Sequence, residues 1–386
     1  MTVCDHQIFP MTLITSAQFL LIVFVVIYLS FNMIHLVRVE SDFGELPSYP
    51  FISVCVPARN EERGVRACLE SLLNQDYPEY EVIVVDDNST DGTTEVICSM
   101  KEQYPNLVFV SGERLAPDWL GKPYALYQAH KKARGEYLLF TDADPVYQPH
   151  ALKSAMRIMM EKDLDLLTLM PATKFGSFWE RAVQPVIFGF IAALTRFRKV
   201  NSAKYGSAVG FGAFLLFKKE PYQRIGGHFS VRAEVVEDVM LARNAKRNGL
   251  TMLAADGKNL FSIRMYYSLK EIWVGWRKNI FLALKGSILR TCHYIFMMLC
   301  FVLTPYLVVI SNLLEGTGWI WTGISMVGLM MTLVAGMVLC HQLDLDKRSV
   351  FLFPLGVVVM SAIMINSMVQ VIFLGQTEWR GRVYEQ

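Results

Sequence analysis

The stretch YLLFTDAD, residues 137–144, decides how the rest of this chain is interpreted. Its first four residues are mostly apolar and form the pattern of a short buried strand. The pattern ends on two carboxylates, Asp142 and Asp144, and Pro145 follows at once. Ligands of open α/β sheets gather beyond the carboxyl ends of the strands, where two carboxylates can hold Mg²⁺ against a phosphate. The alternative interpretation is a capped turn before the next helix.

Strand and helix patterns alternate on both sides of this stretch. Helical spacing at residues 61–74, for example, places Val65, Leu69 and Leu72 on one face. Strands are predicted at residues 51–56, up to Val85, at 107–110, 137–140 and 164–170, and helices at 61–74, 122–133 and 239–247. Strands that alternate with helices over this length predict an α/β domain whose mostly parallel sheet is covered by helices.

Four long runs among the 386 residues carry no Asp, Glu, Lys or Arg. A helix needs about 20 residues to cross about 30 Å of hydrocarbon, and each run is that long. The runs lie at residues 13–37, 291–314, 318–340 and 349–377. The sequence therefore predicts an N-terminal transmembrane anchor at 1–37, a globular domain at 38–290, three hydrophobic transmembrane segments at 291–377 and a polar tail at 378–386.

The charges beside these runs predict an orientation in the membrane. No Lys or Arg precedes the first run and Arg38 follows it, so the positive-inside rule places the globular domain in the cytoplasm, at the inner membrane. The run also exceeds the apolar core of a cleaved signal peptide. Four full spans would put Arg380 and Arg382 outside, against the same rule, unless one of the last three runs is re-entrant or interfacial.

Composition excludes some classes of function. The net charge of +2 is too small to indicate a nucleic-acid partner. The seven cysteines show no CxxC spacing, so neither a disulfide framework nor a zinc site is indicated. A shorter apolar run at residues 178–197 falls short of a span and predicts either a helix in the membrane interface or a buried core helix.

Further acidic residues follow other predicted strands. Asp86 and Asp87 end a strand as Asp142 does, so we expect both acidic sites at the same edge of the sheet, with Glu61 nearby. Like charges at this density are costly unless a cation or ligand donors relieve them. A nucleotide base and a metal-bound diphosphate would do so. The alternative for Asp86 and Asp87 is turn formation, which the sequence Asp-Asn-Ser favours.

Two more groups have a functional and a structural interpretation. Glu237 and Asp238 open a helix, where carboxylates are stabilised by the helix dipole, but Asp238 is also suited to act as a general base. Lys122 is suited to pair with a phosphate, or it is a solvated lysine at a helix start. Trp276 and Arg277 either cover the site or belong to an aromatic and basic belt at the membrane surface.

These motifs, in this order, resemble the family 2 glycosyltransferases with the GT-A fold. The matching segments are SVCVPARNEE, VVDDNSTDGT, the Asp-x-Asp of Asp142 and Asp144, and VVED, within residues 51–249. The resemblance implies an inverting transfer from a UDP-sugar with Mg²⁺ or Mn²⁺, in which Asp238 is the base. It further implies that Asp144 and Asp142 contact the metal and that the nucleotide sugar is bound by Pro57, Arg59, Glu61, Asp86, Asp87, Lys122, Asp142 and Glu237.

Within that family the chain resembles membrane enzymes that glycosylate carotenoids, of the chlorobactene glucosyltransferase type, or that are associated with hopanoid synthesis. The segments that carry this likeness include PDWLGKPYAL, GSAVGFGAFLLFKKEPYQRIGGH and TEWRGRVY. It implies transfer of glucose from UDP-glucose to a hydroxyl of a membrane polyisoprenoid. The Gln-x-x-Arg-Trp element of processive synthases is replaced by WVGWRKN at residues 273–279, which favours a single transfer.

Two alternatives to this interpretation stay open. The first is transfer to a polyprenyl phosphate, as in dolichyl-phosphate mannose synthases, with Arg243, Lys246 and Arg247 as cations beside Asp238. The second is a membrane protein that binds nucleotide sugars without catalysis, because a fold alone does not fix a function. Retained activity of Asp238→Asn would favour the phosphate acceptor, since a hydroxyl needs the base.

Overall fold

The strand predicted at 137–140 lies inside an eight-stranded sheet in the computed structural model, which describes residues 5–41, 44–374, 376–379 and 382–385. The strands are β1 (Val37–Arg38), β2 (Ile52–Ala58), β3 (Tyr80–Asp86), β4 (Leu107–Ser111), β5 (Tyr137–Phe140), β7 (Leu166–Met170), β9 (Leu215–Lys218) and β10 (Met252–Asp256). Their order is β1-β10-β7-β9-β5-β2-β3-β4, and only β9 runs antiparallel to its neighbours. The predicted mostly parallel sheet is confirmed.

Helices cover both faces of this sheet because successive side chains of each strand point to opposite sides. Val54 and Leu139 pack into a core with α2 (Val65–Leu73), α3 (Thr93–Lys101) and α5 (Ala151–Glu161). Cys55 and Phe140 pack into a second core with α4 (Gly121–Lys132) and α9 (Glu237–Arg247). A small sheet of β6 (Val146–Tyr147), β11 (Phe261–Ile263) and β8 (Ala172–Thr173) adjoins the first core.

The sequence predicted a strand at residues 51–56, which would end before Pro57, but the strand is longer. β2 continues through Pro57 to Ala58, where it still pairs with β3. On its other side, β2 pairs with β5 only as far as Cys55. The proline therefore sits where one edge of the strand is no longer paired, and a missing N–H is tolerated at such an edge.

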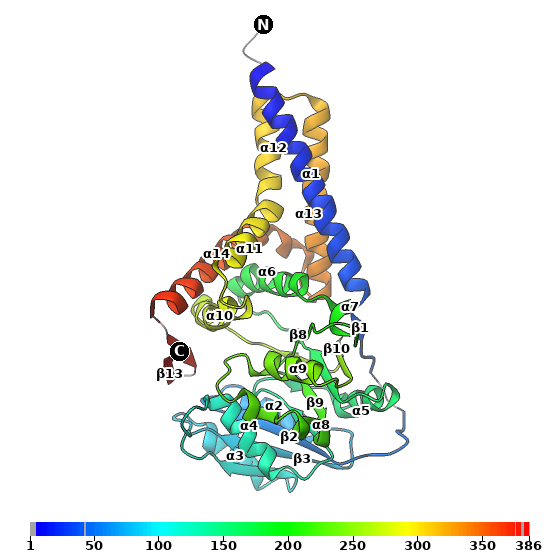
Figure 1. The fold of residues 1–386 in the computed structure, drawn as a ribbon, viewed down its shortest axis with the longest axis vertical. Helices are drawn as coiled ribbons and strands as arrows, with labels where there is room; N and C mark the ends of the chain where they lie inside the picture. Colours follow the sequence, from blue (N-terminus) through cyan, green and yellow to red (C-terminus); the bar gives the residue numbers. More distant parts are fainter. Residues whose placement is uncertain (1–4, 42–43, 375, 380–381, 386) are drawn as a thin grey trace.

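Three helices stand upright at one end of the molecule, away from the sheet (Figure 1). These upright helices are α1 (Asp5–Ile34), α12 (Thr304–Glu315) and α13 (Trp319–Gln342). By length and composition, Pro10–Ile34, Trp319–Gln342 and Lys347–Phe373 can each cross a membrane, and the bent pair of helices Leu269–Ala283 and Ile288–Val302 would make a fourth span. Cys4 and Arg380 lie outside the described residues.

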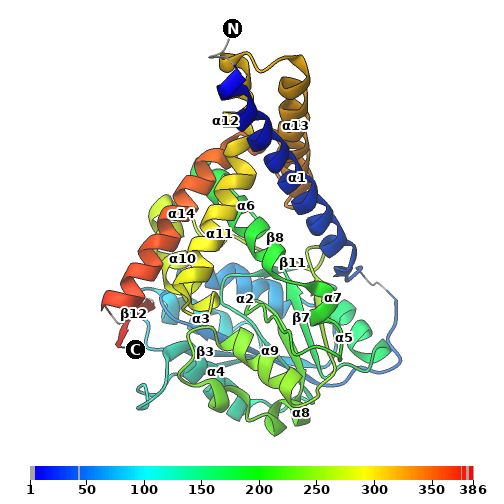
Figure 2. The same cartoon turned by 45° about the horizontal axis from the view of Figure 1, so that its top comes forward.

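A layer of helices lies across the molecule between the upright helices and the sheet (Figures 1 and 2). These crosswise helices are α6 (Phe178–Leu194), α10 (Leu269–Ala283) and α14 (Phe353–Val369), and they share one apolar core. The run at 349–377, predicted as one of three transmembrane segments of which one could be re-entrant or interfacial, thus consists mostly of the crosswise α14. Its Gly356 lies so close to α6 that an added Cβ would stand 2.0 Å from the carbonyl oxygen of Ala182.

The run at 291–314 is not one continuous helix either. It is divided into α11 (Ile288–Val302) and α12, with Leu303 between them. Pro305 follows two residues later and explains the break, because proline lacks an N–H and its ring clashes with the preceding helical turn. Two shorter helices, joined at this point, replace the single span that the sequence predicted.

The chain after α14 returns to the side of the sheet. β12 (Gln376–Trp379) and β13 (Arg382–Glu385) form a hairpin that lies on this side of the crosswise layer in Figure 1. The hairpin is therefore on the same side of the crosswise layer as the sheet. An interfacial segment among the last runs would produce this arrangement.

Both ends of α6 are fixed by hydrogen bonds. At its start, Ser177 and Glu180 form a capping box, and the Glu180 carboxylate also accepts from Arg264 Nε at 3.0 Å and Nη2 at 2.9 Å. At its end, Asn32 Nδ2 of α1 donates to the carbonyl oxygens of Ala192 at 2.7 Å and Thr195 at 2.6 Å. The anchor helix thus satisfies carbonyl groups that the end of α6 leaves open.

Candidate active site

A cavity of about 1750 Å³ lies between the carboxyl ends of the sheet strands and the crosswise helices. Its floor comes from loops after β2, β5 and β7, and its roof from α6 and α10. The predicted site residues that line it are Pro57, Arg59, Glu61, Lys122, Asp142, Asp144, Glu237, Asp238 and Trp276. The structure therefore brings together most of the residues that the sequence singled out, although they span more than half of the chain.

Lys122 joins two of the acidic motifs. Its Nζ lies 2.7 Å from Asp142 Oδ1 and 2.7 Å from Glu237 Oε1, at the start of α4. Burial acts to lower the pKa of Lys122, but the carboxylates of Asp142 and Glu237 outweigh it and raise that pKa well above its usual range. The lysine is therefore a fixed positive charge between the carboxylates.

Asp238 begins the first turn of α9, and its carboxylate opens into the cavity. Burial and the negative charge of Glu237 raise the pKa of Asp238 to about 7, while Lys122 acts in the opposite direction. A carboxyl group with a pKa near neutral can take up a proton at ordinary pH, as a general base must. The raised pKa and the position in the cavity agree with the general base that the sequence predicts, and this role stays a prediction.

The glycine-rich loop before β9 contacts the same charged groups. A Cβ on Gly212 would lie 3.0 Å from Lys122 Nζ, 3.1 Å from Asp238 Oδ2 and 3.6 Å from Asp142 Oδ2. A Cβ on Gly210 would lie 2.2 Å from the carbonyl oxygen of Asp238. Gly210 needs to be glycine because the added Cβ would meet backbone, whereas at Gly212 a Cβ would push the ends of the two side chains back. The sequence showed the richness in glycine, but gave no indication of which residues the loop would touch.

Asp86 and Asp87, which the sequence predicts to bind the nucleotide, make hydrogen bonds within the protein at the end of β3. The Asp86 carboxylate accepts hydrogen bonds from Ser89 N at 3.1 Å, from Ser89 Oγ and from Thr94 Oγ1, so it holds its own loop. Asp87 is buried, and its carbonyl oxygen accepts from Arg59. Among the described residues, neither aspartate lines the cavity. The hydrogen bonds of Asp86 agree with the turn interpretation, and the Asp87 carbonyl oxygen holds Arg59, which lines the cavity. Nucleotide binding by the two aspartates stays a prediction.

Asp142 and Asp144 both line the cavity just beyond β5, as predicted. Within the part of the chain that the structure describes, no group of three His, Cys, Asp or Glu residues is arranged to hold a metal ion. Two carboxylates nevertheless fit Mg²⁺ or Mn²⁺, because such ions in phosphate sites take their other ligands from phosphate and water. Asp142 Oδ1 already forms an ion pair with Lys122. Asp144 is therefore better suited than Asp142 to bind the metal ion directly.

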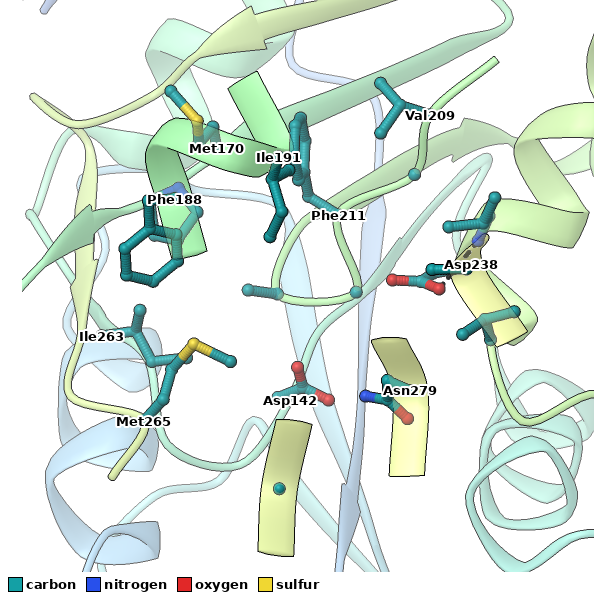
Figure 3. A pocket seen from close by; sticks show the side chains of 18 of the residues that line it. Asp142, Met170, Phe188, Ile191, Val209, Phe211, Asp238, Ile263, Met265 and Asn279 are labelled. Carbon is teal, nitrogen blue, oxygen red and sulfur yellow. Dashed lines mark hydrogen bonds between the residues drawn. The ribbon is translucent and has the colours of Figure 1, made fainter. Parts of the chain in front are cut away.

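The cavity has a polar half and an apolar half (Figure 3). Asp142 and Asp238 face one side of it, and apolar side chains face the other. The apolar half consists of Met170 at the end of β7, Phe188 and Ile191 on α6, and Ile263 and Met265 at and after β11. A ligand with a charged end and an apolar end matches this division.

The roof helix α10 supplies Trp276 to the cavity, as predicted, but not Arg277. Arg277 is not one of the described residues that line the cavity. Its carbonyl oxygen accepts a hydrogen bond from Ser367 on α14. Asn279 also lines the cavity and was missed. One asparagine in an amphipathic helix carries no signal in the sequence, because its role depends on how α10 lies over the sheet.

Comparison with known proteins places this site in context. Residues 53–226 match the model of the family described as glycosyl transferase family 2. The chain is similar to the 4,4'-diaponeurosporenoate glycosyltransferases of Staphylococcus haemolyticus (27% identity, 66% of this chain and 67% of that protein) and Staphylococcus aureus strain USA300 (25% identity, 61% and 62%). The chain thus spans about two thirds or less of these relatives.

A solved structure confirms the fold. The mannosyltransferase PcManGT from Pyrobaculum calidifontis, in complex with GDP-Man and Mn²⁺, aligns with a TM-score of 0.50 and 18% sequence identity. The alignment covers 95% of this chain and 99% of that chain. The likeness therefore includes the helices outside the sheet, and it agrees with the GT-A fold that the sequence motifs had indicated.

Proposed function

We propose a specific reaction for this chain, which carries a glycosyltransferase family 2 domain on a GT-A fold: transfer of a hexose from a UDP-sugar to a membrane polyisoprenoid. The observation that carries the proposal is the divided cavity, with Asp142 and Asp238 on one side and Phe188 and Ile191 on the other. Its roof helices α6 and α10 belong to the layer that supports the upright apolar helices. An acceptor dissolved in a membrane would reach the site from that layer.

The donor is proposed to be UDP-glucose, bound at the loops after β2 and β5. Pro57, Arg59 and Glu61 line that end of the cavity. Asp144, with Asp142, would hold a divalent cation such as Mg²⁺ or Mn²⁺, which supplies positive charge against the departing diphosphate. Lys122 keeps the carboxylates of Asp142 and Glu237 in place through two contacts of 2.7 Å.

The acceptor group is proposed to be a hydroxyl, such as that of a hydroxylated carotenoid. Asp238 takes the hydroxyl proton while the oxygen attacks the anomeric carbon from the face opposite UDP, so the configuration inverts and UDP leaves. The pKa of Asp238, raised to about 7 by burial and by Glu237, suits this role.

A carboxylate acceptor is the second candidate, because the relatives named above are diaponeurosporenoate glycosyltransferases. A carotenoid carboxylate is already ionised at neutral pH and needs no base. The two candidates therefore differ in their need for Asp238. Asp238→Asn keeps the shape of the side chain and removes the base.

The test uses the purified full-length protein in lipid nanodiscs with radiolabelled UDP-glucose. The acceptor panel contains a hydroxylated carotenoid, a carotenoid carboxylate and undecaprenyl phosphate, each with Mg²⁺, with Mn²⁺ and with EDTA. Labelling of the hydroxylated carotenoid that is lost in Asp238→Asn would support the proposal. Labelling of the carboxylate that survives Asp238→Asn would favour the second candidate. Labelling of undecaprenyl phosphate alone, or no transfer at all, would overturn both.

A further inference from the structure

The roof helix α10 carries two buried polar atoms that the protein leaves without partners. Within the described part of the chain, neither Asn279 Oδ1 nor Trp276 Nε1 has a hydrogen-bond partner, and both residues line the cavity. A buried polar atom without a partner costs about 1–3 kcal/mol, so most such atoms in folded proteins are satisfied. A turn of the Asn279 carboxamide about its last bond would present Oδ1 to a molecule bound in the cavity, which would supply the missing partner.

The position of α10 is fixed from its other side by α14. Trp273 Nε1 donates to Asn366 Oδ1 at 3.1 Å, and Phe281 N donates to Ser367 Oγ at 3.3 Å. Ser367 Oγ also donates to the carbonyl oxygen of Arg277. These contacts hold one face of α10 against α14. A different face, with Asn279, is thereby held toward the cavity.

Asn279 belongs to the polar half of the cavity. In Figure 3 its carboxamide lies next to Asp142 and Asp238, while Phe188 and Met265 lie on the opposite side. An apolar acceptor chain fits the apolar half. A sugar ring is polar and uncharged, and it suits the space beside Asn279 and the two aspartates.

We propose that Asn279 binds a ring hydroxyl of the transferred hexose and helps to select the sugar, an inference that rests on the proposed function. The carboxylates of Asp142 and Asp238 accept hydrogen bonds when ionised, and Lys122 only donates them. A carboxamide both donates and accepts, as a sugar hydroxyl does. It also adds no charge to a site that already holds several.

The test compares the wild-type protein with Asn279→Ala and Asn279→Gln in nanodiscs. The donors are UDP-glucose and its 2-, 3-, 4- and 6-deoxy analogues, and kcat/KM is measured for each. In the wild type, removal of the hydroxyl that Asn279 binds should lower kcat/KM by about 3- to 10-fold, the value of one hydrogen bond. In Asn279→Ala the loss of kcat/KM for that one deoxy donor should disappear, because the hydrogen bond between Asn279 and the hydroxyl is already broken. The losses of kcat/KM for the other analogues, called penalties below, should stay.

Controls separate this role from a structural one. Asn248→Ala changes an exposed asparagine at the end of α9 and should keep all wild-type penalties. The Kd of UDP and the KM of the acceptor should be the same in Asn279→Ala and wild type, and Asn279→Gln should restore part of the lost penalty. Unchanged penalties in Asn279→Ala, or a change confined to the KM of the acceptor, would overturn the inference. If the wild type transfers no glucose at all, the proposed function itself fails.

Discussion

Lys122, Asp142, Glu237 and Asp238 form one electrostatic unit at the polar half of the cavity. Lys122 contacts two of the three carboxylates directly and lowers the pKa of the third. A change to any one of these residues should therefore act on the others. The behaviour of the base is the part of this coupling that is easiest to measure.

The first prediction concerns pH. Asp238 must be ionised to accept a proton, and its pKa is raised to about 7, so kcat/KM with a hydroxyl acceptor should fall about tenfold per pH unit below neutral. Lys122→Met removes a charge that lowers this pKa, so the acid limb should move to higher pH. Initial rates measured below and above neutral pH test both statements. If kcat/KM falls over the same pH range in Lys122→Met as in the wild type, then Lys122 does not lower the pKa of Asp238.

The second prediction concerns Gly212. Its added Cβ would stand 3.0 Å from Lys122 Nζ and 3.1 Å from Asp238 Oδ2, so Gly212→Ala must displace the lysine and the base. Even a small displacement of catalytic groups slows a reaction strongly, so kcat/KM should fall by about 10- to 100-fold. Because the displaced atoms are ends of side chains, the melting temperature should change little. Wild-type activity in Gly212→Ala would show that the loop is farther from these groups.

Part of this site could be predicted from the sequence. Asp142 and Asp144 follow a strand pattern directly, and Asp238 follows a helix start, so local patterns give their positions. Asn279 and Gly212 could not be found in this way, since they reach the site only after α10 and the glycine-rich loop have packed over the sheet. For Asp86 the sequence predicts the correct sheet edge but does not show that Ser89 and Thr94 donate hydrogen bonds to its carboxylate.

At the scale of elements, the contact between α6 and α14 supports the roof of the cavity. Gly356 of α14 lies against the backbone of Ala182, and Ile187 and Met360 belong to the core that the two helices share. Small residues allow helices in apolar surroundings to approach in this way. The same helix α6 presents Phe188 and Ile191 to the cavity, so its packing should influence the acceptor side of the site.

The third prediction tests this contact. Gly356→Ala places a Cβ 2.0 Å from the carbonyl oxygen of Ala182, so the two helices must separate. Overpacking of this kind costs about 1–3 kcal/mol, and the melting temperature in detergent should fall by several degrees. Gly323→Ala in α13 is the matched control, because its Cβ meets nothing within 4 Å. Equal melting temperatures for the two variants would show that α14 does not pack so closely on α6.

The elements were predictable to the extent that their patterns are local. Alternation of strands and helices gave the sheet, and β5 coincides with the run at 137–140. The apolar runs were long enough to span a membrane, yet length does not give direction, and α14 lies crosswise because its partners α6 and α10 do. The search for long uncharged runs took no account of Pro305, so it missed the helix break between α11 and α12.

At the scale of the whole molecule, charge is distributed unevenly about the upright helices. At the end away from the sheet, α12 ends on Glu315, and the loop that follows to α13 has no Lys or Arg. The other end is rich in basic residues, among them Arg38, Lys270, Lys285 and Arg290. We therefore propose, by the positive-inside rule, that the globular domain, the crosswise helices and the final hairpin face the cytoplasm.

The last prediction measures that orientation with a membrane-impermeant maleimide. Cys98 on α3 is exposed and marks the side of the globular domain. Glu315→Cys places an exposed thiol at the end of α12, and Lys347→Cys places one beyond the other end of α13. In intact spheroplasts only Glu315→Cys should gain label over the wild type, and Cys98 and Lys347→Cys should react only after lysis. Label on Lys347→Cys before lysis, with Cys98 still protected, would mean that α13 does not return the chain to the side of the sheet. The crosswise helices would then not lie at the cytoplasmic surface of the membrane. A membrane acceptor could not enter the apolar half of the cavity by the proposed route.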